Sequence, residues 1–418
     1  MNGKYIVMGG NRLTGEISAG GAKNSVLPIM AATLLAEGKT VIEGVPYLSD
    51  VEVMKEVLRH AGAIVEHKQH RLEVEVNSLQ TTEIPENLTR KLRASNLVMG
   101  ALLARAGKAN VAYPGGCSIG SRPLDLHLKG LQSLGADIEE KGGYIQARSS
   151  QLVGSDIHLD FPSVGATENL MLAAVLAKGT TVIRNAAKEP EIVDLQNFLN
   201  SMGGNVRGAG LGTITIEGVT SLHGTHHEVI PDRVEVATYM VAAAITQGDV
   251  TIKNTIPEHV EPVIAKLRET GAEITVEGDS VRVRGPKKLK GVNIRTLPYP
   301  GFPTDVQPQM MTLLAITQGA SMITETIFEN RFKHAGELRR MGADITLEGR
   351  VALIKGVPKL SGAFVEATDL RAGVALVLAG LVADGITVVE NISHILRGYE
   401  GLDTKLKQLG ANVIFVES

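Results

Sequence analysis

The strongest constraint on the fold of this chain is an internal repeat of roughly 70 residues that occurs six times along it. Each copy contains an alanine-rich apolar stretch, then a glycine, then a short run of β-branched residues, such as residues 39–45 or 386–392. A glycine between two such stretches is typical of a helix that ends and a strand that begins. The six glycines are Gly38, Gly107, Gly179, Gly248, Gly319 and Gly385.

A second glycine recurs at the same period and ends another helical pattern, as in the segments LRHAGAIV and LKQLGANV. An alternating hairpin follows it, for example at residues 274–283. One repeat therefore has the predicted order βαβαββ, and we expect an α/β protein built from six such units. The glycines of this second set are Gly62, Gly135, Gly203, Gly271, Gly342 and Gly410.

The repeats also predict two lobes. The sixth repeat stops directly after the strand that follows Gly410, and residues 5–17 match the strand–turn–strand outline of residues 351–364. We therefore expect the N-terminal segment to complete the last repeat. The expected lobes are residues 22–231 (repeats one to three) and residues 1–21 with 232–418 (repeats four to six), which are ordinary domain sizes.

Composition narrows the function classes. The chain has 418 residues, 44% of them apolar, so each lobe can bury a core, and its net charge of −3 argues against a nucleic-acid partner. The longest apolar run, near residues 373–383, is too short to span a bilayer, and the first residues lack the pattern of a signal peptide. A single cysteine excludes an internal disulfide and fits a reducing cytoplasm, which is the location we expect.

Charged and amide residues gather at one phase of the repeat. Counting back a fixed interval from each glycine of the first set reaches the expected starts of six helices, whose unpaired N–H groups and dipole favour anions. Neighbours of these positions include Lys23, Ser163 and Asp369. The pattern predicts helix ends that converge on an anionic ligand. The six positions are Asn24, Arg93, Gly165, Val234, Asp305 and Arg371.

The lone Cys117 lies in the segment YPGGCSIGSRP, residues 113–123. A single cysteine is often an inert core residue, but three glycines and two prolines indicate an exposed loop here. Arg122 follows five residues later, and a nearby cation lowers the pKa of a thiol. Cys117 is therefore a candidate nucleophile or proton donor. His127 follows as well, but the sequence assigns no Cys–His dyad.

Several other candidates each have a structural alternative. Lys23 and Asn24, behind two glycines, suit a phosphate cradle, although we expect Asn24 or the next serine to cap the helix in any case. Asp305 is a candidate general base or an N-cap. Arg331 is either a site residue or a surface residue. The sequence around Arg397 does not by itself indicate a functional role.

Asp369 and Arg371 are the last two candidate site residues, and the histidines are the last possible metal ligands. Asp369 and Arg371 form an internal ion pair or contact the ligand directly. His226 and His227 lie in a polar turn and are expected to face solvent. We find no zinc, iron–sulfur or dinucleotide motif, so no cofactor is expected.

Nine motifs together resemble a known family over essentially the whole chain, and the cysteine loop is the most specific of them. That family is UDP-N-acetylglucosamine 1-carboxyvinyltransferase. The motifs are GAKNS at 21–25, LRAS at 92–95, PGGCSIGSRPLDLH at 114–127, SVGAT at 163–167, PDRVE at 231–235, FPTD at 302–305, ENRF at 329–332, TDLR at 368–371 and RGYE at 397–400.

The resemblance implies a two-lobed inside-out α/β barrel of six βαβαββ units. It also implies the transfer of the enolpyruvyl group of phosphoenolpyruvate to the 3′-hydroxyl of UDP-N-acetylglucosamine, with release of phosphate. This is the first committed step of peptidoglycan synthesis, and it uses no metal or redox cofactor.

The resemblance further implies roles for individual residues. Lys23, Arg122 and Arg397 would hold phosphoenolpyruvate, Cys117 would protonate its methylene carbon, and Asp305 would take the proton of the sugar hydroxyl. The Cys117 thiolate would attack and open the epoxide of the family inhibitor fosfomycin. Arg331, Asp369 and Arg371 would support the site. The remaining substrate contacts would come from Asn24 and Ile327 at the amino sugar, Arg93 and Arg122, Pro123, Leu124, Asp125 and Leu126 at the uridine nucleotide, and Ser163, Val164 and Gly165 at its diphosphate.

One departure and two alternatives accompany this resemblance. Phe161 and Pro162 replace a basic residue that some members carry before SVGAT, so a side-chain contact to phosphate is in doubt there. A 5-enolpyruvylshikimate-3-phosphate synthase would share the fold and the donor, but it lacks the PGGC loop. A non-catalytic six-unit clamp around DNA would need basic helix faces, and the charges here are balanced.

Overall fold

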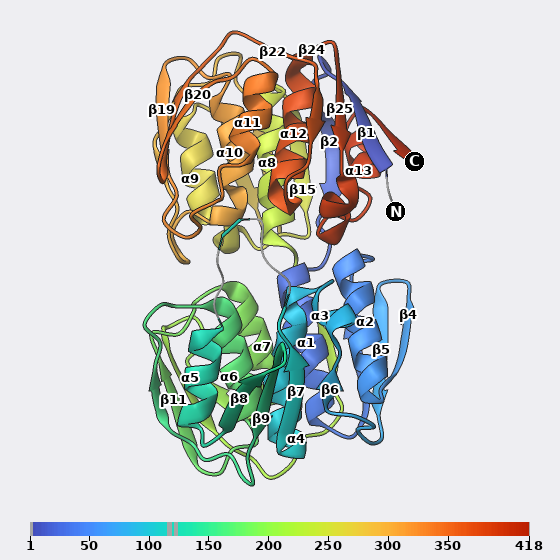
Figure 1. The fold of residues 1–418 in the computed structure, drawn as a ribbon. Coiled ribbons are helices and arrows are strands. Elements are labelled where there is room, and N and C mark those ends of the chain that lie inside the picture. Colours follow the sequence, from blue (N-terminus) through green and yellow to red (C-terminus); the bar gives the residue numbers. More distant parts are fainter. Residues whose placement is uncertain (1–2, 115–118, 121–123, 418) are drawn as a thin grey trace. The chain divides into compact units, whose positions relative to one another are not determined.

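The computed structural model describes residues 3–114, 119–120 and 124–417. These residues form two compact units, shown in Figure 1. The first, unit A, comprises residues 3–20, 119–120 and 231–417; the second, unit B, comprises residues 21–114 and 124–230.

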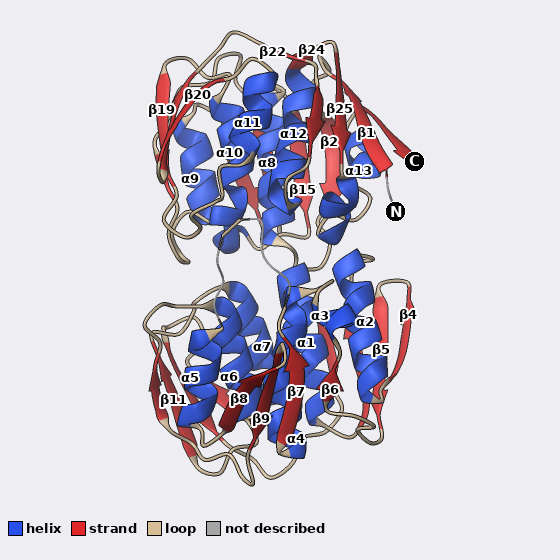
Figure 2. Cartoon of the chain, in the orientation of Figure 1, coloured by secondary structure: helices blue, strands red, loops and turns tan. Residues whose placement is uncertain are grey.

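Within the described residues, six four-stranded sheets share one plan (Figure 2). A short strand pairs in parallel with a central strand, and two antiparallel strands follow on the other side of the central strand. The sheets of unit B are β14-β3-β5-β4, β6-β7-β9-β8 and β10-β11-β13-β12. Their strands are β3 (Gly38–Glu43), β4 (Ile64–Lys68), β5 (Arg71–Val76), β6 (Glu83–Ile84), β7 (Lys108–Ala112), β8 (Asp137–Lys141), β9 (Tyr144–Arg148), β10 (Asp156–His158), β11 (Thr180–Arg184), β12 (Asn205–Arg207), β13 (Thr213–Glu217) and β14 (His226–Glu228).

Unit A repeats the plan in the sheets β2-β15-β17-β16, β18-β19-β21-β20 and β23-β25-β1-β26. Strand β1 pairs with β25 on one side and β26 on the other, so it holds the place in its sheet that β21 holds in the neighbouring repeat. The strands are β1 (Gly3–Met8), β2 (Thr14–Ser18), β15 (Asp249–Lys253), β16 (Glu273–Glu277), β17 (Ser280–Arg284), β18 (Ile294–Arg295), β19 (Ala320–Thr324), β20 (Asp344–Glu348), β21 (Val351–Lys355), β23 (Phe364–Glu366), β25 (Ile386–Glu390), β26 (Asn412–Glu417) and the small pair β22 (Leu360–Ser361) and β24 (Ala383–Asp384).

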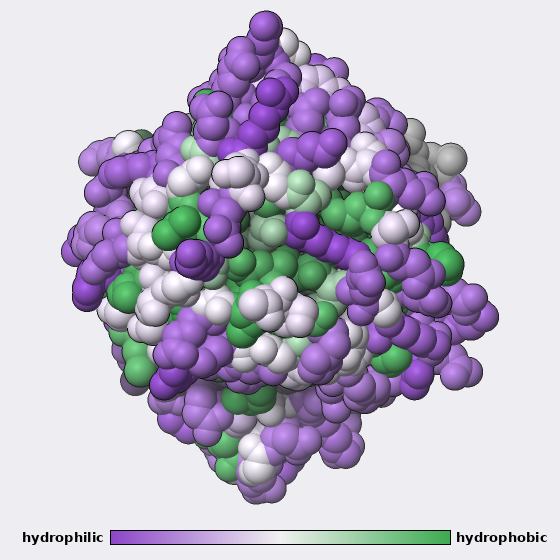
Figure 3. Space-filling view, turned by 90° about the horizontal axis from the view of Figure 1, so that it is seen from below, coloured by the Kyte–Doolittle hydropathy of each residue, from purple (hydrophilic) through white to green (hydrophobic). Residues whose placement is uncertain are grey.

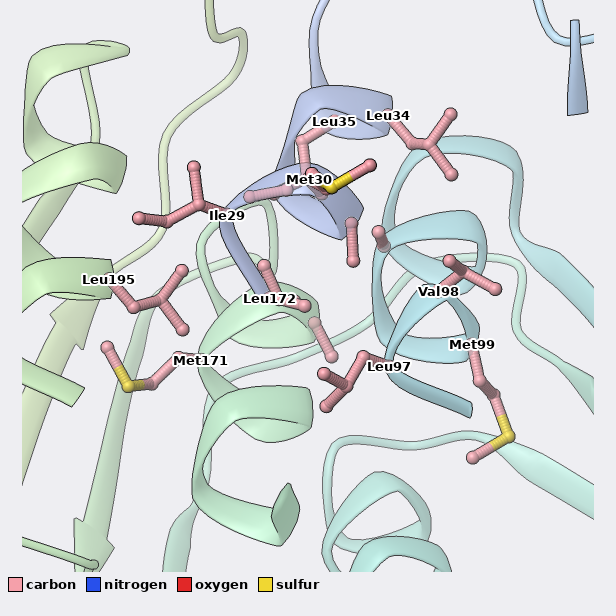
Figure 4. Close-up of a cluster of buried hydrophobic side chains, with 14 of the residues drawn as sticks. Ile29, Met30, Leu34, Leu35, Leu97, Val98, Met99, Met171, Leu172 and Leu195 are labelled. Atoms are coloured by element: carbon pink, nitrogen blue, oxygen red, sulfur yellow. The ribbon is translucent and has the colours of Figure 1, made fainter. Parts of the chain in front are cut away.

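Three helices in each unit are apolar around most of their surface and form its centre. In α8 twelve of the thirteen residues are buried, which is the pattern of a helix enclosed on all sides. Figure 4 shows the equivalent core of unit B, where Met30, Val98 and Leu172 come from three different helices. The inner helices are α1 (Lys23–Ala32), α4 (Val98–Ala106), α6 (Val164–Ala174), α8 (Arg233–Ile245), α10 (Gln307–Leu314) and α12 (Leu370–Val382).

The other helices are amphipathic or short. They are α2 (Ser49–Ala61), α3 (Glu86–Thr89), α5 (Asp125–Ser133), α7 (Pro190–Ser201), α9 (Glu261–Glu269), α11 (His334–Arg340) and α13 (Leu402–Gln408), with 3-10 turns η1 (Thr33–Leu35), η2 (Arg93–Leu97), η3 (Pro257–Val260), η4 (Thr304–Val306) and η5 (Ile392–Arg397). Buried helices inside and sheets outside confirm the predicted inside-out α/β fold of six repeats.

The two sets of repeat glycines differ in what they do. The second set ends helices as predicted, and its members have left-handed φ values, for example 110° at Gly62. In the first set, Gly107 is the C-cap of α4, but Gly179 lies beyond the end of α6, in the turn that enters β11. The prediction that every glycine of the first set ends its helix is therefore wrong, because most of them shape the turn before a central strand.

The surface carries both apolar and hydrophilic residues. Figure 3 shows one face on which apolar side chains gather near the middle of a largely hydrophilic surround. Some apolar exposure is normal for a folded protein, so this face alone indicates no partner. Among the described helices none combines the length and the apolar character that a bilayer crossing needs.

Candidate active site

The first turn of α1 holds Lys23 in a buried ion pair. Its Nζ lies 3.2 Å from Oδ2 of Asp50, in the first turn of α2, and the two side chains are only 10% and 4% exposed. A buried pair of this kind is costly to break, because the remaining charge would lose its partner out of water. Asp50 therefore fixes the lysine ammonium at the start of α1.

The next residues of α1 are held by a second buried carboxylate. Asp194 of α7 accepts a short hydrogen bond from the Ser25 hydroxyl, and it also accepts from the Ile230 N–H at 3.3 Å. His227 Nε2 lies 2.9 Å from the same carboxylate, and its side chain is 12% exposed. The expectation that His227 faces solvent is therefore wrong, although His226 is 63% exposed.

The predicted side-chain cap of α1 is also wrong. The N-cap is Ala22, and no side chain caps the helix, because the Ser25 hydroxyl is directed to Asp194 instead. Asn24 is half-buried in the first turn, beside Lys23.

A second helix start in unit B carries the predicted SVGAT segment. Ser163 is the N-cap of α6, and its Oγ accepts from the Ala166 N–H at 3.3 Å. Val164 and Gly165 form the first turn and are half-buried, while Phe161 is 44% exposed just before them. The backbone N–H groups of this turn make it a suitable place for an anion.

The segment proposed to bind uridine begins α5. Leu124 is buried, Asp125 is exposed at the first position of the helix, and Leu126 is half-buried. Arg93 begins the 3-10 turn η2 that leads into α4. Cys117, Arg122 and Pro123 lie outside the residues that the structure describes.

In unit A the central group is the Asp305 carboxylate. Arg331 donates from Nη2 to Oδ1 at 2.9 Å, and Arg371 donates from Nη2 to Oδ2 at 3.2 Å. The arginine side chains are 1% and 4% exposed, whereas that of Asp305 is 29% exposed. Two buried guanidinium groups thus orient a carboxylate that solvent or a substrate can reach.

These contacts decide two of the alternatives that the sequence left open. No side chain caps η4 or α10, so the capping role considered for Asp305 is wrong. Arg331 is buried and is not a surface residue. Arg371 lies over the Tyr399 ring, 5.4 Å from its centroid. Burial lowers the pKa of Arg371, but Tyr399, Asp305 and Asp232 outweigh it and hold that pKa above its ordinary value.

Asp369 does not pair with the Arg371 side chain. It caps α12, where its Oδ1 accepts the backbone N–H groups of Arg371 and Ala372 at 2.9 and 3.0 Å. The internal ion pair considered from the sequence is therefore wrong. Ile327 is half-buried and donates its N–H to Glu325, and Arg397 is the half-buried last residue of η5.

The sequence missed His334, which opens α11 three residues after Arg331. It is fully buried, and among the described residues neither ring nitrogen has a partner at ordinary hydrogen-bond geometry. Burial is the main reason that its pKa falls to about 4; the Asp369 charge and a backbone contact at Arg331 oppose the shift, and the Arg331 charge adds to it. Asp50 and Asp194 were missed as well, since carboxylates in ordinary helical patterns carry no local signal.

The structure thus brings Asp305, Arg331 and Arg371 into direct contact within unit A, with Asp369 at the adjacent helix start. Within unit B it groups Lys23 with Asp50, and Ser163 with Val164 and Gly165. Across residues 3–114, 119–120 and 124–417, no three His, Cys, Asp or Glu side chains are placed to share a metal ion.

Comparisons with known proteins agree with this arrangement. The family model for EPSP synthase (3-phosphoshikimate 1-carboxyvinyltransferase) matches residues 7–406. The enolpyruvyl transferase NikO from Streptomyces tendae has a similar structure, with a TM-score of 0.89 and 27% identity over 100% of this chain and 99% of that one. An EPSP synthase from Acinetobacter baumannii gives a TM-score of 0.77 at 21% identity, covering 99% of this chain and 100% of that one, which shows the fold alone.

Fold and sequence together define the class, which is that of the carboxyvinyl (enolpyruvyl) transferases, so this protein is an enzyme. A UDP-N-acetylglucosamine 1-carboxyvinyltransferase 1 from Carboxydothermus hydrogenoformans is 58% identical over 98% of this chain and 97% of its own length. A second such enzyme, from Caldanaerobacter subterraneus, is 56% identical over 99% of each chain. The chain belongs to the UDP-N-acetylglucosamine 1-carboxyvinyltransferase family.

Proposed function

We propose that this enzyme transfers the enolpyruvyl group of phosphoenolpyruvate to the 3′-hydroxyl of UDP-N-acetylglucosamine and releases phosphate, in the first committed step of peptidoglycan synthesis. The observation that carries the proposal is the Asp305 carboxylate, which two buried arginines orient while it stays partly open. The names and full-length similarity of the relatives support the same substrates.

The chemistry needs an acid, a base and cations. Cys117 donates a proton to the methylene carbon of phosphoenolpyruvate, which leaves an oxocarbenium-like centre at the adjacent carbon. The sugar oxygen attacks that centre while Asp305 accepts the hydroxyl proton. Phosphate then leaves with the electron pair of its C–O bond, and loss of the added proton restores the double bond. Lys23, Arg122 and Arg397 offset the charge of the phosphate and carboxylate groups.

The nucleotide is proposed to bind at the helix starts of unit B. Ser163, Val164 and Gly165 offer backbone N–H groups to the diphosphate, and the capped, half-buried first turn of α6 supports this role. Asn24 and Ile327 contact the amino sugar. The uridine contacts come from Arg93 and from residues 122–126.

The lobes at residues 22–231 and at residues 1–21 with 232–418 are proposed to act as the two halves of a closing enzyme that excludes water from the reactive enol. The substrates place the reaction in the cytoplasm and link it to cell-wall growth, cell shape and division.

A phosphate-release assay tests the proposal. Phosphoenolpyruvate with UDP-N-acetylglucosamine should release phosphate, whereas phosphoenolpyruvate with shikimate 3-phosphate should not. Release with shikimate 3-phosphate alone would assign the enzyme to the other branch of the class.

The role of Cys117 has its own test. Fosfomycin should add once to the protein, at the single cysteine, and mass spectrometry should find the adduct. Cys117→Asp keeps a proton donor but loses the nucleophile, so it should stay active and resist fosfomycin. Cys117→Ser should be far slower, because a hydroxyl is a weaker acid than a thiol; full activity of this variant would remove Cys117 from the reaction.

A further inference from the structure

One buried amide connects three helix starts of unit B. Asn169 lies in α6 and is 0% exposed. Its Oδ1 accepts the N–H of Gly100 in α4 at 2.7 Å, and its Nδ2 donates to the carbonyl of Asn96 in η2 at 3.3 Å. The same Nδ2 lies 3.1 Å from Nδ1 of His127 in α5. Asn169 therefore touches η2, α4 and α5 from its place in α6.

These partners fix which way the amide points. The Gly100 N–H can only donate, so the atom that it meets is the oxygen of Asn169. The Asn96 carbonyl can only accept, so the atom facing it is the nitrogen. The second hydrogen of that nitrogen is left for His127 Nδ1, which must then accept. The geometry therefore places the proton of a neutral His127 ring on Nε2.

The His127 ring also packs on the first turn of α6. A Cβ at Gly165 would lie 3.3 Å from Cε1 and 3.4 Å from Nε2 of the ring, which is tighter than most real Cβ contacts. Gly165 thus allows the ring edge to lie against the backbone of the SVGAT turn. His127 is 6% exposed, so the ring is enclosed between Asn169 and this turn.

We propose that Asn169 is a positioning residue for nucleotide binding, which holds the starts of α5 and α6 and the η2–α4 segment in register through His127, Asn96 and Gly100. The inference rests on the proposed function, because it assumes that these starts bind the uridine diphosphate. Asn169 touches none of the reacting atoms. It acts through the relative placement of the residues at 93, 124–126 and 163–165.

The tautomer of His127 gives a test that does not depend on activity. In the full-length protein, long-range ¹H–¹⁵N NMR should show the His127 proton on Nε2. Asn169→Asp replaces the donor with a carboxylate oxygen, so the proton should move to Nδ1 or the ring should gain a second one. A wild-type proton on Nδ1 would overturn the inference, even if the enzyme makes the expected product.

Binding and turnover give the second test. In Asn169→Asp we expect the Kd and KM for UDP-N-acetylglucosamine to rise about tenfold, with kcat and the KM for phosphoenolpyruvate within about twofold of wild type, because a lost positioning contact weakens binding before chemistry. Equal losses in all parameters, or unchanged nucleotide affinity, would contradict a positioning role. If Asn169→Asp does not fold, Asn169→Ala is judged by the same criteria.

Asn200→Asp is the matched control. Asn200 also uses both amide atoms, at 2.8 Å each, but both bonds go to the backbone of Val206 near the far end of α7. We expect this variant to bind nucleotide like wild type. A wild-type protein that binds no UDP-N-acetylglucosamine would refute the proposed function. Normal binding by wild type with unchanged affinity in Asn169→Asp would refute the positioning role alone.

Discussion

Both units have ion pairs at equivalent helix starts. The central charged group of the cluster is a cation in unit B and an anion in unit A. In unit B a cation, Lys23, is held by the buried carboxylate of Asp50. In unit A a carboxylate, Asp305, is held by the buried guanidinium groups of Arg331 and Arg371. Each cluster also has a neighbouring histidine. His227 bonds to Asp194, whereas neither nitrogen of His334 makes a hydrogen bond of ordinary geometry with the residues that the structure describes.

The difference teaches how one repeat serves two chemical tasks. The same position within the repeat forms a helix start in both units, and helix starts alone favour anions. Unit B strengthens that preference with a lysine. Unit A reverses it by placing a partly exposed carboxylate there, which compensates the charges of two buried arginines. The first arrangement suits the binding of an anion, and the second suits the acceptance of a proton.

The largest expected effect is at the centre of unit A. Asp305→Ala removes the proposed base, so kcat should fall by about 100-fold or more while nucleotide affinity stays close to wild type. Steady-state kinetics would measure kcat, and calorimetric titration with UDP-N-acetylglucosamine would measure the nucleotide affinity.

Asp249→Ala is the matched control for this prediction. Asp249 also binds two arginines, Arg282 and Arg284, but its side chain is 39% exposed on β15. We expect little change in kcat there. Near-normal turnover of Asp305→Ala would show that Asp305 does not act as the base, so the proposed difference in chemical task between the two units would not hold.

The next effect concerns stability and pH. The folded pKa of His334 is about 4, below the ordinary value of 6.5, so the unfolded chain takes up the proton first as the pH falls. The contribution of His334 to stability is therefore complete above pH 6.5 and is lost as the pH falls towards 4, by about 3 kcal/mol in total.

Urea unfolding across this range measures the effect as the stability difference between wild type and His334→Gln. That difference should change with pH, because the unfolded chain takes up the proton before the folded protein does. A pH-independent difference for His334→Gln would show that this histidine titrates normally in the folded protein.

A smaller effect is expected at the cation of unit B. Lys23→Gln should raise the KM for phosphoenolpyruvate by about tenfold, because a charged hydrogen bond to the anion is lost. Lys39→Gln makes the same change in an ion pair with Glu73 where the lysine is 53% exposed, and it should be nearly silent. An unchanged KM in Lys23→Gln would show that the ion pair of Lys23 with Asp50 is structural and that this lysine does not bind phosphoenolpyruvate.

The smallest effect is expected at Asp194. Asp194→Asn keeps the shape but replaces one acceptor, which should cost about 1 kcal/mol of unfolding free energy in urea. Asp156→Asn, at an exposed pair with Arg184, should cost less. If both variants lose the same stability, the Asp194 cluster does not organise the start of α1.

Periodicity explains what could be predicted from the sequence. Recurring glycines and apolar stretches gave the six βαβαββ repeats, because these patterns are local and repeat along the chain. Charged residues at one phase pointed to helix starts, and Asn24, Gly165 and Arg371 do lie in first turns. Asp305 lies in the 3-10 turn just before α10.

Long-range partners explain what could not be predicted. Arg331 is 26 residues from Asp305, and Ser25 is 169 residues from Asp194. No spacing rule connects such pairs, so the sequence left Arg331 open between a site residue and a surface residue and suggested Asn24 or Ser25 as the helix cap. His334 lacks a well-formed hydrogen bond within the described part of the chain, and burial of that kind leaves no trace in a sequence pattern.

The place of β1 has a consequence for how the protein is made. Strand β1 is synthesised before the residues of unit B, whereas its neighbours β25 and β26 are synthesised after them. All of the described residues of unit B lie between them, so we expect that unit to complete its core during translation. Throughout that time β1 remains without its native sheet partners, and we expect its apolar residues to stay unpaired until β25 and β26 have been synthesised.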